Sequence, residues 1–208
     1  MPCEDFTQAT LCSVVPEKAA VLTSTLEELS IPTLTVSCQI PLPIAIDYPN
    51  PSAIGADRLA NASALTPLQS PAIVIDFGTA VTFDVISPDQ GGTYLGGVIA
   101  PGLGALRNDL HRRTALLPRI DLAEPPSAIG KSTEHAMQVG AVIGYRGLIR
   151  EILLSLAREL PSPAVIHATG GDAPLIASKM PEIQHLDPDL TLKGILRIGE
   201  QQNHSNSC

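Results

Sequence analysis

Apolar runs along the chain alternate with polar segments rich in Gly and Pro, and this pattern predicts a mixed α/β protein. Helices are predicted over residues 16–29, 56–64, 103–114 and 133–160. Short apolar runs predict strands at residues 11–16, 31–38, 73–76, 81–86, 94–99 and 164–168. The segment from Pro88 to Gly92 separates two of these strands and predicts the turn of an antiparallel hairpin.

The composition changes around residues 66–71, and this predicts a boundary between two domains. We expect the remainder of an N-terminal domain at residues 1–70 and a second domain at residues 71–200. A last short helix or strand should follow Gly194. The polar residues 201–208 are typical of a disordered tail.

Composition narrows the fold class and the partners. Hydrophobic residues make up 44 % of the chain but aromatic residues only 3 %, so the core must consist of Ala, Val, Ile and Leu, which favours buried parallel strands. The net charge of −8 argues against nucleic-acid binding and gives no attraction to an anionic membrane. The four cysteines lack metal-ligand spacing and are expected to be free thiols. Without a signal peptide or a long apolar span, the expected location is cytoplasmic.

Two acidic loops carry the candidate chemistry. Asp57 and Arg58 open a predicted helix, where together they could take a proton and bind an anion. The simpler alternatives for Asp57 are a first-turn carboxylate that the helix dipole favours and an ion pair with Arg58. Asp76 ends a buried strand and is followed by Gly78 and Thr79, which suits a phosphate and its cation. An ordinary turn between strands would also use Asp and Gly here.

Seven short motifs occur in order between residue 13 and about residue 198. They are Ser13-Val-Val-Pro, Gly55-Ala-Asp-Arg, Asp76-Phe-Gly-Thr-Ala, Gly96-Gly-Val-Ile-Ala-Pro-Gly, Gly130-Lys-Ser-Thr, Thr169-Gly-Gly and Leu190-Thr-Leu-Lys-Gly. Each motif alone is weak, whereas the ordered set is specific, and it resembles the type III pantothenate kinase family. The resemblance implies a duplicated ribonuclease-H-like α/β fold of the actin-like ATPase and sugar kinase superfamily.

The resemblance fails at the start of the sequence. The family begins with an Asp-x-Gly-Asn-Thr loop that holds the ATP phosphates, and no such motif occurs in the twelve residues before Ser13. We therefore expect the first half of the duplicated fold to be incomplete. We also expect this chain to have little or no turnover.

The resemblance implies a role for each residue of the first acidic loop. Asp57 would be the general base that takes the proton from the pantothenate hydroxyl, and Arg58 would bind the pantothenate carboxylate. Gly55 and Ala56 would bring the backbone close to the substrate. Tyr48 would line the same pocket, although a tyrosine in a proline-rich loop is as often only packed there.

Further roles follow for the second loop and for the long helix. Asp76 would coordinate a monovalent cation, K⁺ or NH₄⁺, and Gly78 and Thr79 would contact the nucleotide. Thr133 would touch the substrate, although its sequence position favours a helix N-cap. The glycines of the Gly96–Gly102 motif and the turn Thr169-Gly-Gly are expected near the nucleotide.

The implied activity is ATP-dependent phosphorylation of pantothenate with Mg²⁺, the first step of coenzyme A biosynthesis. A homodimer through the second domain is expected, with the Gly140/Gly144 region of the long helix as a plausible contact. Two alternatives stay open. One is an inactive relative that binds or regulates, and the other is a kinase of the same superfamily for a different small acid.

Overall fold

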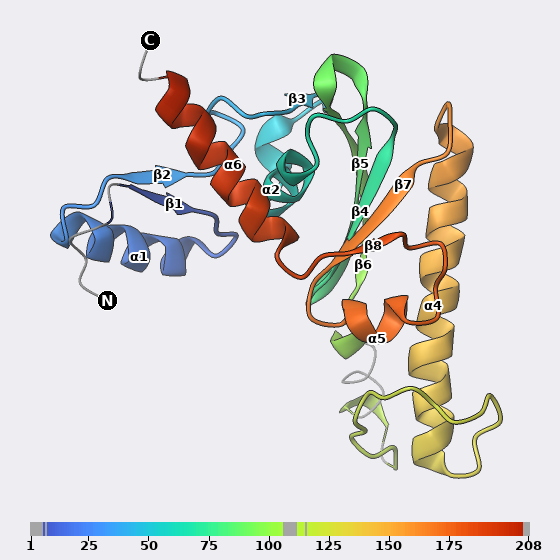
Figure 1. Ribbon diagram of the computed structural model, residues 1–208. Coiled ribbons are helices and arrows are strands. Elements are labelled where there is room, and N and C mark those ends of the chain that lie inside the picture. The colour runs from blue at the N-terminus through green and yellow to red at the C-terminus, as the bar shows by residue number, and fades with distance from the viewer. Residues whose placement is uncertain (1–5, 7, 106–111, 115, 206–208) are drawn as a thin grey trace. The chain divides into compact units, whose positions relative to one another are not determined.

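The computed structural model describes residues 6, 8–105, 112–114 and 116–205 (Figure 1). It has the predicted α/β architecture, with a two-stranded sheet and a six-stranded sheet. The chain forms two compact units, each assembled from segments that are distant in the sequence. The first unit comprises Met1–Gln69, Asp84–Gly96 and Asp189–Cys208, and the second comprises Ser70–Phe83 and Gly97–Pro188.

The first unit combines short strands with three helices. Its elements are β1 (Ala9–Leu11), α1 (Pro16–Glu28), β2 (Thr33–Thr35), β3 (Ala45–Ile46), the 3₁₀ turn η2 (Pro51–Ala53), α2 (Ala56–Ala64) and α6 (Leu190–Ser205). Strands β1 and β2 pair in parallel. Helices α2 and α6 pack closely, and the Thr191 hydroxyl donates to Asn61 Oδ1 at 2.7 Å. A Cβ atom at Gly194 of α6 would overlap the carbonyl oxygen of Ala60, so glycine permits this approach.

The larger sheet has the strand order β3-β6-β5-β4-β7-β8. Its remaining strands are β4 (Ala72–Phe77), β5 (Ala80–Ser87), β6 (Thr93–Pro101), β7 (Val165–Thr169) and β8 (His185–Leu186). Strands β4 and β7 are parallel, with Ala72 opposite Val165. Neighbouring β5 and β6 are joined only by a short turn with η3 (Asp89–Gly91), which requires an antiparallel pair. The predicted hairpin is therefore confirmed.

The second unit places the long helix α4 (Thr133–Glu159) and the short helix α5 (Ala173–Ala177) beside β4 and β7 (Figure 1). Arg146 of α4 is only 3 % exposed. Its guanidinium donates to both carboxylate oxygens of Glu124, at 3.0 and 2.6 Å. It also donates to the carbonyl oxygens of Leu175 and Ile176, at 2.7 and 3.1 Å. This arginine therefore links α4 to α5 and to the loop that carries Glu124.

The C-terminal segment differs most from the sequence prediction. Helix α6 continues to Ser205, so the disordered tail predicted from residue 201 is wrong for residues 201–205. Side chains along this helix form hydrogen bonds to distant segments, which the polar sequence alone does not predict. For example, the Gln202 amide donates to the Pro41 carbonyl oxygen at 2.8 Å. The segment from Asp189 onward belongs to the first unit, whereas residues 71–200 were predicted to form a single second domain.

The expectations for the helix at residues 103–114 and for the four cysteines can each be compared with only part of the residues concerned. Residues 103–105 and 112–113 are helical, while the middle of the helix predicted over 103–114 lies outside the described residues. Of the four cysteines, Cys12 and Cys38 are described, and both are free thiols.

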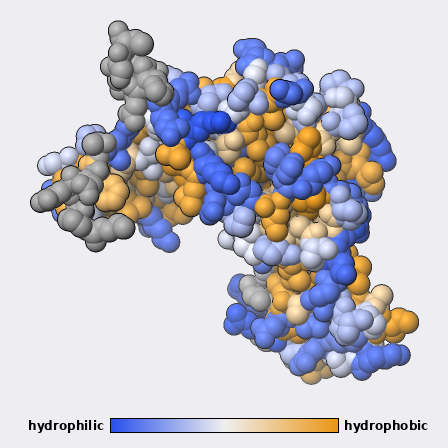
Figure 2. All heavy atoms as spheres, in the orientation of Figure 1, coloured by the Kyte–Doolittle hydropathy of each residue, from blue (hydrophilic) through white to orange (hydrophobic). Residues whose placement is uncertain are grey.

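Apolar side chains lie among polar ones on the face shown in Figure 2. The exposed apolar side chains of the chain include Val21 and Leu22 of α1, which are 67 % and 49 % exposed, and Leu154 of α4, which is 55 % exposed. Within the described part of the chain, no helix is both long enough and apolar enough to cross a membrane.

Candidate functional site

The first group of predicted residues lies at the start of α2. Gly55 is the N-cap residue, and Asp57 and Arg58 occupy the first turn, where all three are half-buried. Asp57 Oδ1 accepts a hydrogen bond from the Arg58 backbone N–H at 2.8 Å. A Cβ atom at Gly55 would lie 2.5 Å from the same oxygen, so the carboxylate sits directly against the Gly55 backbone. The helix start thus holds the Asp57 carboxylate in place, as the simpler alternative for this residue also requires.

The thiol of Cys12 lies in the electrostatic field of Asp57. Burial raises the pKa of Cys12 to about 11, and the negative charge of Asp57 contributes to the shift. Cys12 is therefore a neutral thiol near neutral pH, and it does not compete with Asp57 as a proton acceptor.

Arg58 forms an ion pair with a residue that the sequence analysis did not select. Its Nε–H donates to Oδ1 of Asp84 at 2.6 Å, and the Asp84 side chain is completely buried. The Tyr94 hydroxyl donates to the same oxygen at 3.0 Å. The Arg58 Cζ atom lies 5.8 Å from the centre of the Tyr94 ring, which is within the range of a cation–π interaction. Tyr48 packs edge-on against Tyr94, with ring centres 6.2 Å apart.

Burial dominates the electrostatics of this group. It raises the pKa of Asp84 to about 7, although Arg58 and the Tyr94 hydroxyl both favour the ionised form. Burial and the charge of Asp84 raise the pKa of Tyr94 as well, so its hydroxyl stays a hydrogen-bond donor. A signal for Asp84 was present in the sequence, because an acidic residue in the middle of a buried apolar strand requires a partner.

The second group lies at the turn between β4 and β5. Asp76 is half-buried near the end of β4, and Gly78 and Thr79 are exposed in the turn that follows. A Cβ atom at Gly170 would lie 2.6 Å from Asp76 Oδ1, and one at Gly102 would overlap the carbonyl oxygens of Gly78 and Thr79. Two glycines distant in the sequence therefore approach this turn closely. The expectation that Gly102 and the turn at Gly170 lie near the nucleotide stays a prediction.

Thr133 is the first residue of α4 and is exposed. The N-cap is the preceding residue, Ser132, whose hydroxyl accepts from the His135 backbone N–H at 3.1 Å. The alternative that Thr133 caps the helix is therefore wrong. Among the described residues, no hydrogen bond or ion pair joins Thr133 to the turn that contains Gly78 and Thr79.

The predicted residues divide between the two units of the chain. Tyr48, Gly55, Ala56, Asp57 and Arg58 belong to the first unit, together with the newly found Asp84 and Tyr94. Asp76, Gly78, Thr79 and Thr133 belong to the second unit. The described residues contain no cluster of three or more His, Cys, Asp or Glu side chains suited to holding a metal ion.

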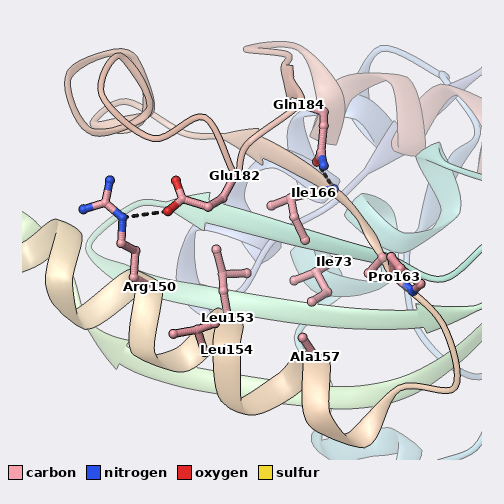
Figure 3. Close-up of a pocket in the computed structure, with 10 residues that line it drawn as sticks. Ile73, Arg150, Leu153, Leu154, Ala157, Pro163, Ile166, Glu182 and Gln184 are labelled. Atoms are coloured by element: carbon pink, nitrogen blue, oxygen red, sulfur yellow. Dashed lines mark hydrogen bonds and ion pairs between the residues drawn. The ribbon is translucent and has the colours of Figure 1, made fainter.

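A cavity of about 310 Å³ in the second unit contains none of the predicted residues. Its walls are mostly apolar side chains of α4, β4 and β7, among them Leu153, Ile73 and Ile166 (Figure 3). At one end, Arg150 Nε donates to Glu182 Oε1 at 2.7 Å (Figure 3). Both side chains of this pair are about 40 % exposed, at 40 % and 39 %. The cavity is an apolar recess with a solvated charged end.

Comparison with known proteins gives these groups a family. The sequence profile of the type III pantothenate kinases matches residues 1–155. A type III pantothenate kinase of Akkermansia muciniphila is 52 % identical over 199 residues, which cover 95 % of this chain and 80 % of that protein. A second, from Methylacidiphilum infernorum, is 46 % identical over 203 residues, covering 96 % of this chain and 72 % of that protein. The chain belongs to the type III pantothenate kinase family.

All predicted site residues lie inside the part of the chain that matches the type III pantothenate kinase profile. A solved structure adds a likeness in fold. It is a Campylobacter jejuni protein described as a member of a Baf family of transcriptional activators, with a TM-score of 0.65 and 20 % sequence identity. The match covers 95 % of this chain and 84 % of that one. At this identity the likeness concerns the fold alone.

Proposed function

We propose that this type III pantothenate kinase transfers the γ-phosphoryl group of ATP to pantothenate. The reaction is ATP + (R)-pantothenate → ADP + 4′-phosphopantothenate, the first step of coenzyme A biosynthesis. Family membership supports the reaction. The observation that carries the assignment of residues is the half-buried pair at the start of α2, where a carboxylate and an anchored guanidinium are adjacent in the sequence.

On the substrate side, Asp57 accepts the proton of the primary hydroxyl of pantothenate. Its carboxylate is held by the Arg58 backbone N–H, which limits the positions it can occupy. Arg58 binds the substrate carboxylate, because a planar guanidinium offers paired N–H donors that match the two oxygens. Gly55 and Ala56 present the backbone of the helix start, and Tyr48 lines the same side.

On the nucleotide side, Gly78 and Thr79 contact the phosphates. They are exposed, and glycines at 102 and 170 keep side chains away from the turn. Asp76 contributes one carboxylate, which fits a cation that keeps most of its water or shares phosphate oxygens. We assign K⁺ or NH₄⁺ to Asp76, and Mg²⁺ to the ATP phosphates, whose charge it neutralises.

The same proposal includes the duplicated ribonuclease-H-like fold and a homodimer formed through α4. Gly140 and Gly144 lie four residues apart on this helix, and a Cβ atom at either would meet no atom within 4 Å. Ile143 between them is 40 % exposed. Small residues and an exposed apolar side chain allow a second helix to approach closely. Thr133, at the start of α4, contacts the substrate in this proposal. A cytoplasmic location stays a prediction from the sequence.

The experiment compares the wild-type chain with Asp57→Asn in two assays. Calorimetry measures pantothenate binding, and a coupled assay measures ADP release with pantothenate, Mg²⁺ and K⁺. Asp57→Asn should bind pantothenate within about twofold of the wild type. Whatever rate of ADP release the wild type shows should fall roughly 100-fold or more in this variant, because the general base is lost. A near-normal rate would remove Asp57 from this role. If the wild type did not bind pantothenate, the assignment of pantothenate as the substrate would be wrong. The wild-type rate also tests the low turnover predicted above.

A further inference from the structure

Asp84 is the most unusual charged residue of the first unit. Its side chain has no exposed surface. It is an acidic residue in the centre of β5, between the apolar residues Phe83 and Val85. One carboxylate oxygen, Oδ1, accepts from both Arg58 and Tyr94. The other oxygen, Oδ2, is buried and has no hydrogen-bond partner among the described protein atoms. A carboxylate in such surroundings needs a reason other than packing.

The ion pair is not explained by a gain in folding stability. The desolvation of a carboxylate and a guanidinium can cost more free energy than their attraction provides, and apolar residues often stabilise such a position equally well. The unpartnered Oδ2 adds to this cost. What the arrangement does supply is geometry. Asp84 holds Arg58 at Nε, and the Tyr94 ring lies 5.8 Å from the guanidinium carbon, so these two neighbours restrict the orientation of the guanidinium.

We propose that Asp84 is a positioning residue that holds the Arg58 guanidinium in the orientation in which it receives the carboxylate of the substrate. The inference rests on the proposed function, in which Arg58 makes that contact. Asp84 binds the nitrogen nearest the arginine stem, whereas a substrate carboxylate is bound best by the two terminal nitrogens at the far end of the guanidinium. Asp84 thus selects for an acid over a neutral ligand without touching either.

The negative charge of Asp84 acts in the opposite direction, because it repels a substrate carboxylate. Orientation outweighs this repulsion where two paired hydrogen bonds must form at once, since a rotated guanidinium loses both. The variant Asp84→Asn removes the repulsion and also replaces the charge-assisted hydrogen bond to Arg58 by a weaker neutral one, so the two effects change the binding of the acid in opposite directions. If repulsion dominated, the change would strengthen the binding of the acid.

The experiment compares pantothenate with its primary amide, which has the same shape but no carboxylate charge. Dissociation constants of both ligands are measured by calorimetry for the wild-type chain, Asp84→Asn and Asp89→Asn. Asp89 is the matched control, because it is an exposed aspartate on the turn between β5 and β6 of the same unit. We expect Asp84→Asn to bind pantothenate about tenfold more weakly while amide binding changes less than about twofold. Asp89→Asn should behave as the wild type.

Other outcomes have distinct meanings. If the wild type binds the acid and the amide equally, the contact between Arg58 and the substrate fails, and the proposed function loses its carboxylate site. If the wild type prefers the acid and Asp84→Asn retains the preference or increases it, only the positioning role is overturned. An equal loss for both ligands would show that Asp84 supports the fold alone, which also overturns the proposal.

A second measurement needs no folded variant of Asp84. Because burial raises the pKa of Asp84 to about 7, lowering the pH from 8 to 6 protonates it in the wild type, while the substrate acid stays ionised. The acid-to-amide preference should therefore fall over this range, and a constant preference would contradict the proposal. Among the described residues, the titratable and charged groups that act on Asp84 are Arg58 and Asp57 from α2 and Tyr94 from β6. Asp57→Asn should retain the pH dependence, which would assign it to Asp84.

Discussion

The close approach of Gly170 to Asp76 makes the sharpest stability prediction, for the substitution Gly170→Ala. Gly170 has φ of 94°, a left-handed conformation that L-residues adopt at a cost of roughly 1–2 kcal/mol. A Cβ atom there would lie 2.6 Å from Asp76 Oδ1, 2.6 Å from the Phe77 nitrogen and 2.7 Å from the Phe77 carbonyl carbon. Two of these atoms belong to the backbone, so the strand end must move, and overpacking of this kind costs about 1–3 kcal/mol.

The two contributions together predict that Gly170→Ala lowers the free energy of unfolding by about 2–5 kcal/mol. The neighbouring Gly171→Ala is the matched control, because a Cβ atom at Gly171 meets nothing within 4 Å. Its effect should stay within about 0.5 kcal/mol. Urea titrations followed by far-ultraviolet circular dichroism measure both, and the dependence on urea concentration should be unchanged. If the two variants were equally stable, the inference that Gly170 closes against the Asp76 turn would be refuted.

Two further pairs of substitutions test packing in each unit by the same titrations. Gly194→Ala should destabilise the chain by about 2–4 kcal/mol, because its Cβ atom would overlap the Ala60 carbonyl oxygen. Gly147→Ala in α4 is the control, and it should stabilise the chain by up to about 1 kcal/mol because its Cβ atom would enter open space. Equal effects of the two substitutions would contradict the close packing of α6 on α2. Arg146→Ala should lower the free energy of unfolding by about 3–5 kcal/mol, because it removes five hydrogen bonds from a buried site. Arg150→Ala should lower it by less than about 1 kcal/mol, because the side chains of the Arg150–Glu182 pair are 40 % and 39 % exposed. Similar losses would show that Arg146 is no more essential than a surface arginine.

The elements that the sequence predicted well are those whose signals are local. Helix α2 begins and ends at the predicted residues, with a glycine before it and an acidic residue in its first turn. Strands β4 to β6 lie within two residues of their predicted bounds, because apolar residues predominate in each segment. The two-residue strands β3 and β8 carry no periodic signal and exist only through pairing with β6 and β7. Helix α6 was underestimated because contacts with distant segments stabilise its polar end.

The candidate site divides in the same way. Asp57, Arg58 and Asp76 were predicted from short motifs because each stands next to the residues that define its local geometry. Asp84 was not, because its role depends on Arg58, 26 residues earlier, and on Tyr94, ten residues later. An acidic residue in an apolar strand indicates only that a polar or charged partner exists. The identity of that partner is a property of the fold.

The hairpin of β5 and β6 explains why the glycine motif at residues 96–102 has two roles. All of its glycines are expected near the nucleotide, and this stays a prediction. Gly96 has φ of 124° and packs against Tyr48, since a Cβ atom there would lie 3.4 Å from Tyr48 Cε2. Gly102 approaches the turn of Gly78 and Thr79. One strand thus contributes at its start to the aromatic and charged group of the first unit and at its end to the turn of the second. A mutation in the hairpin should therefore be interpreted by its position along the strand, because Gly96 variants disturb Tyr48 whereas Gly102 variants disturb the turn.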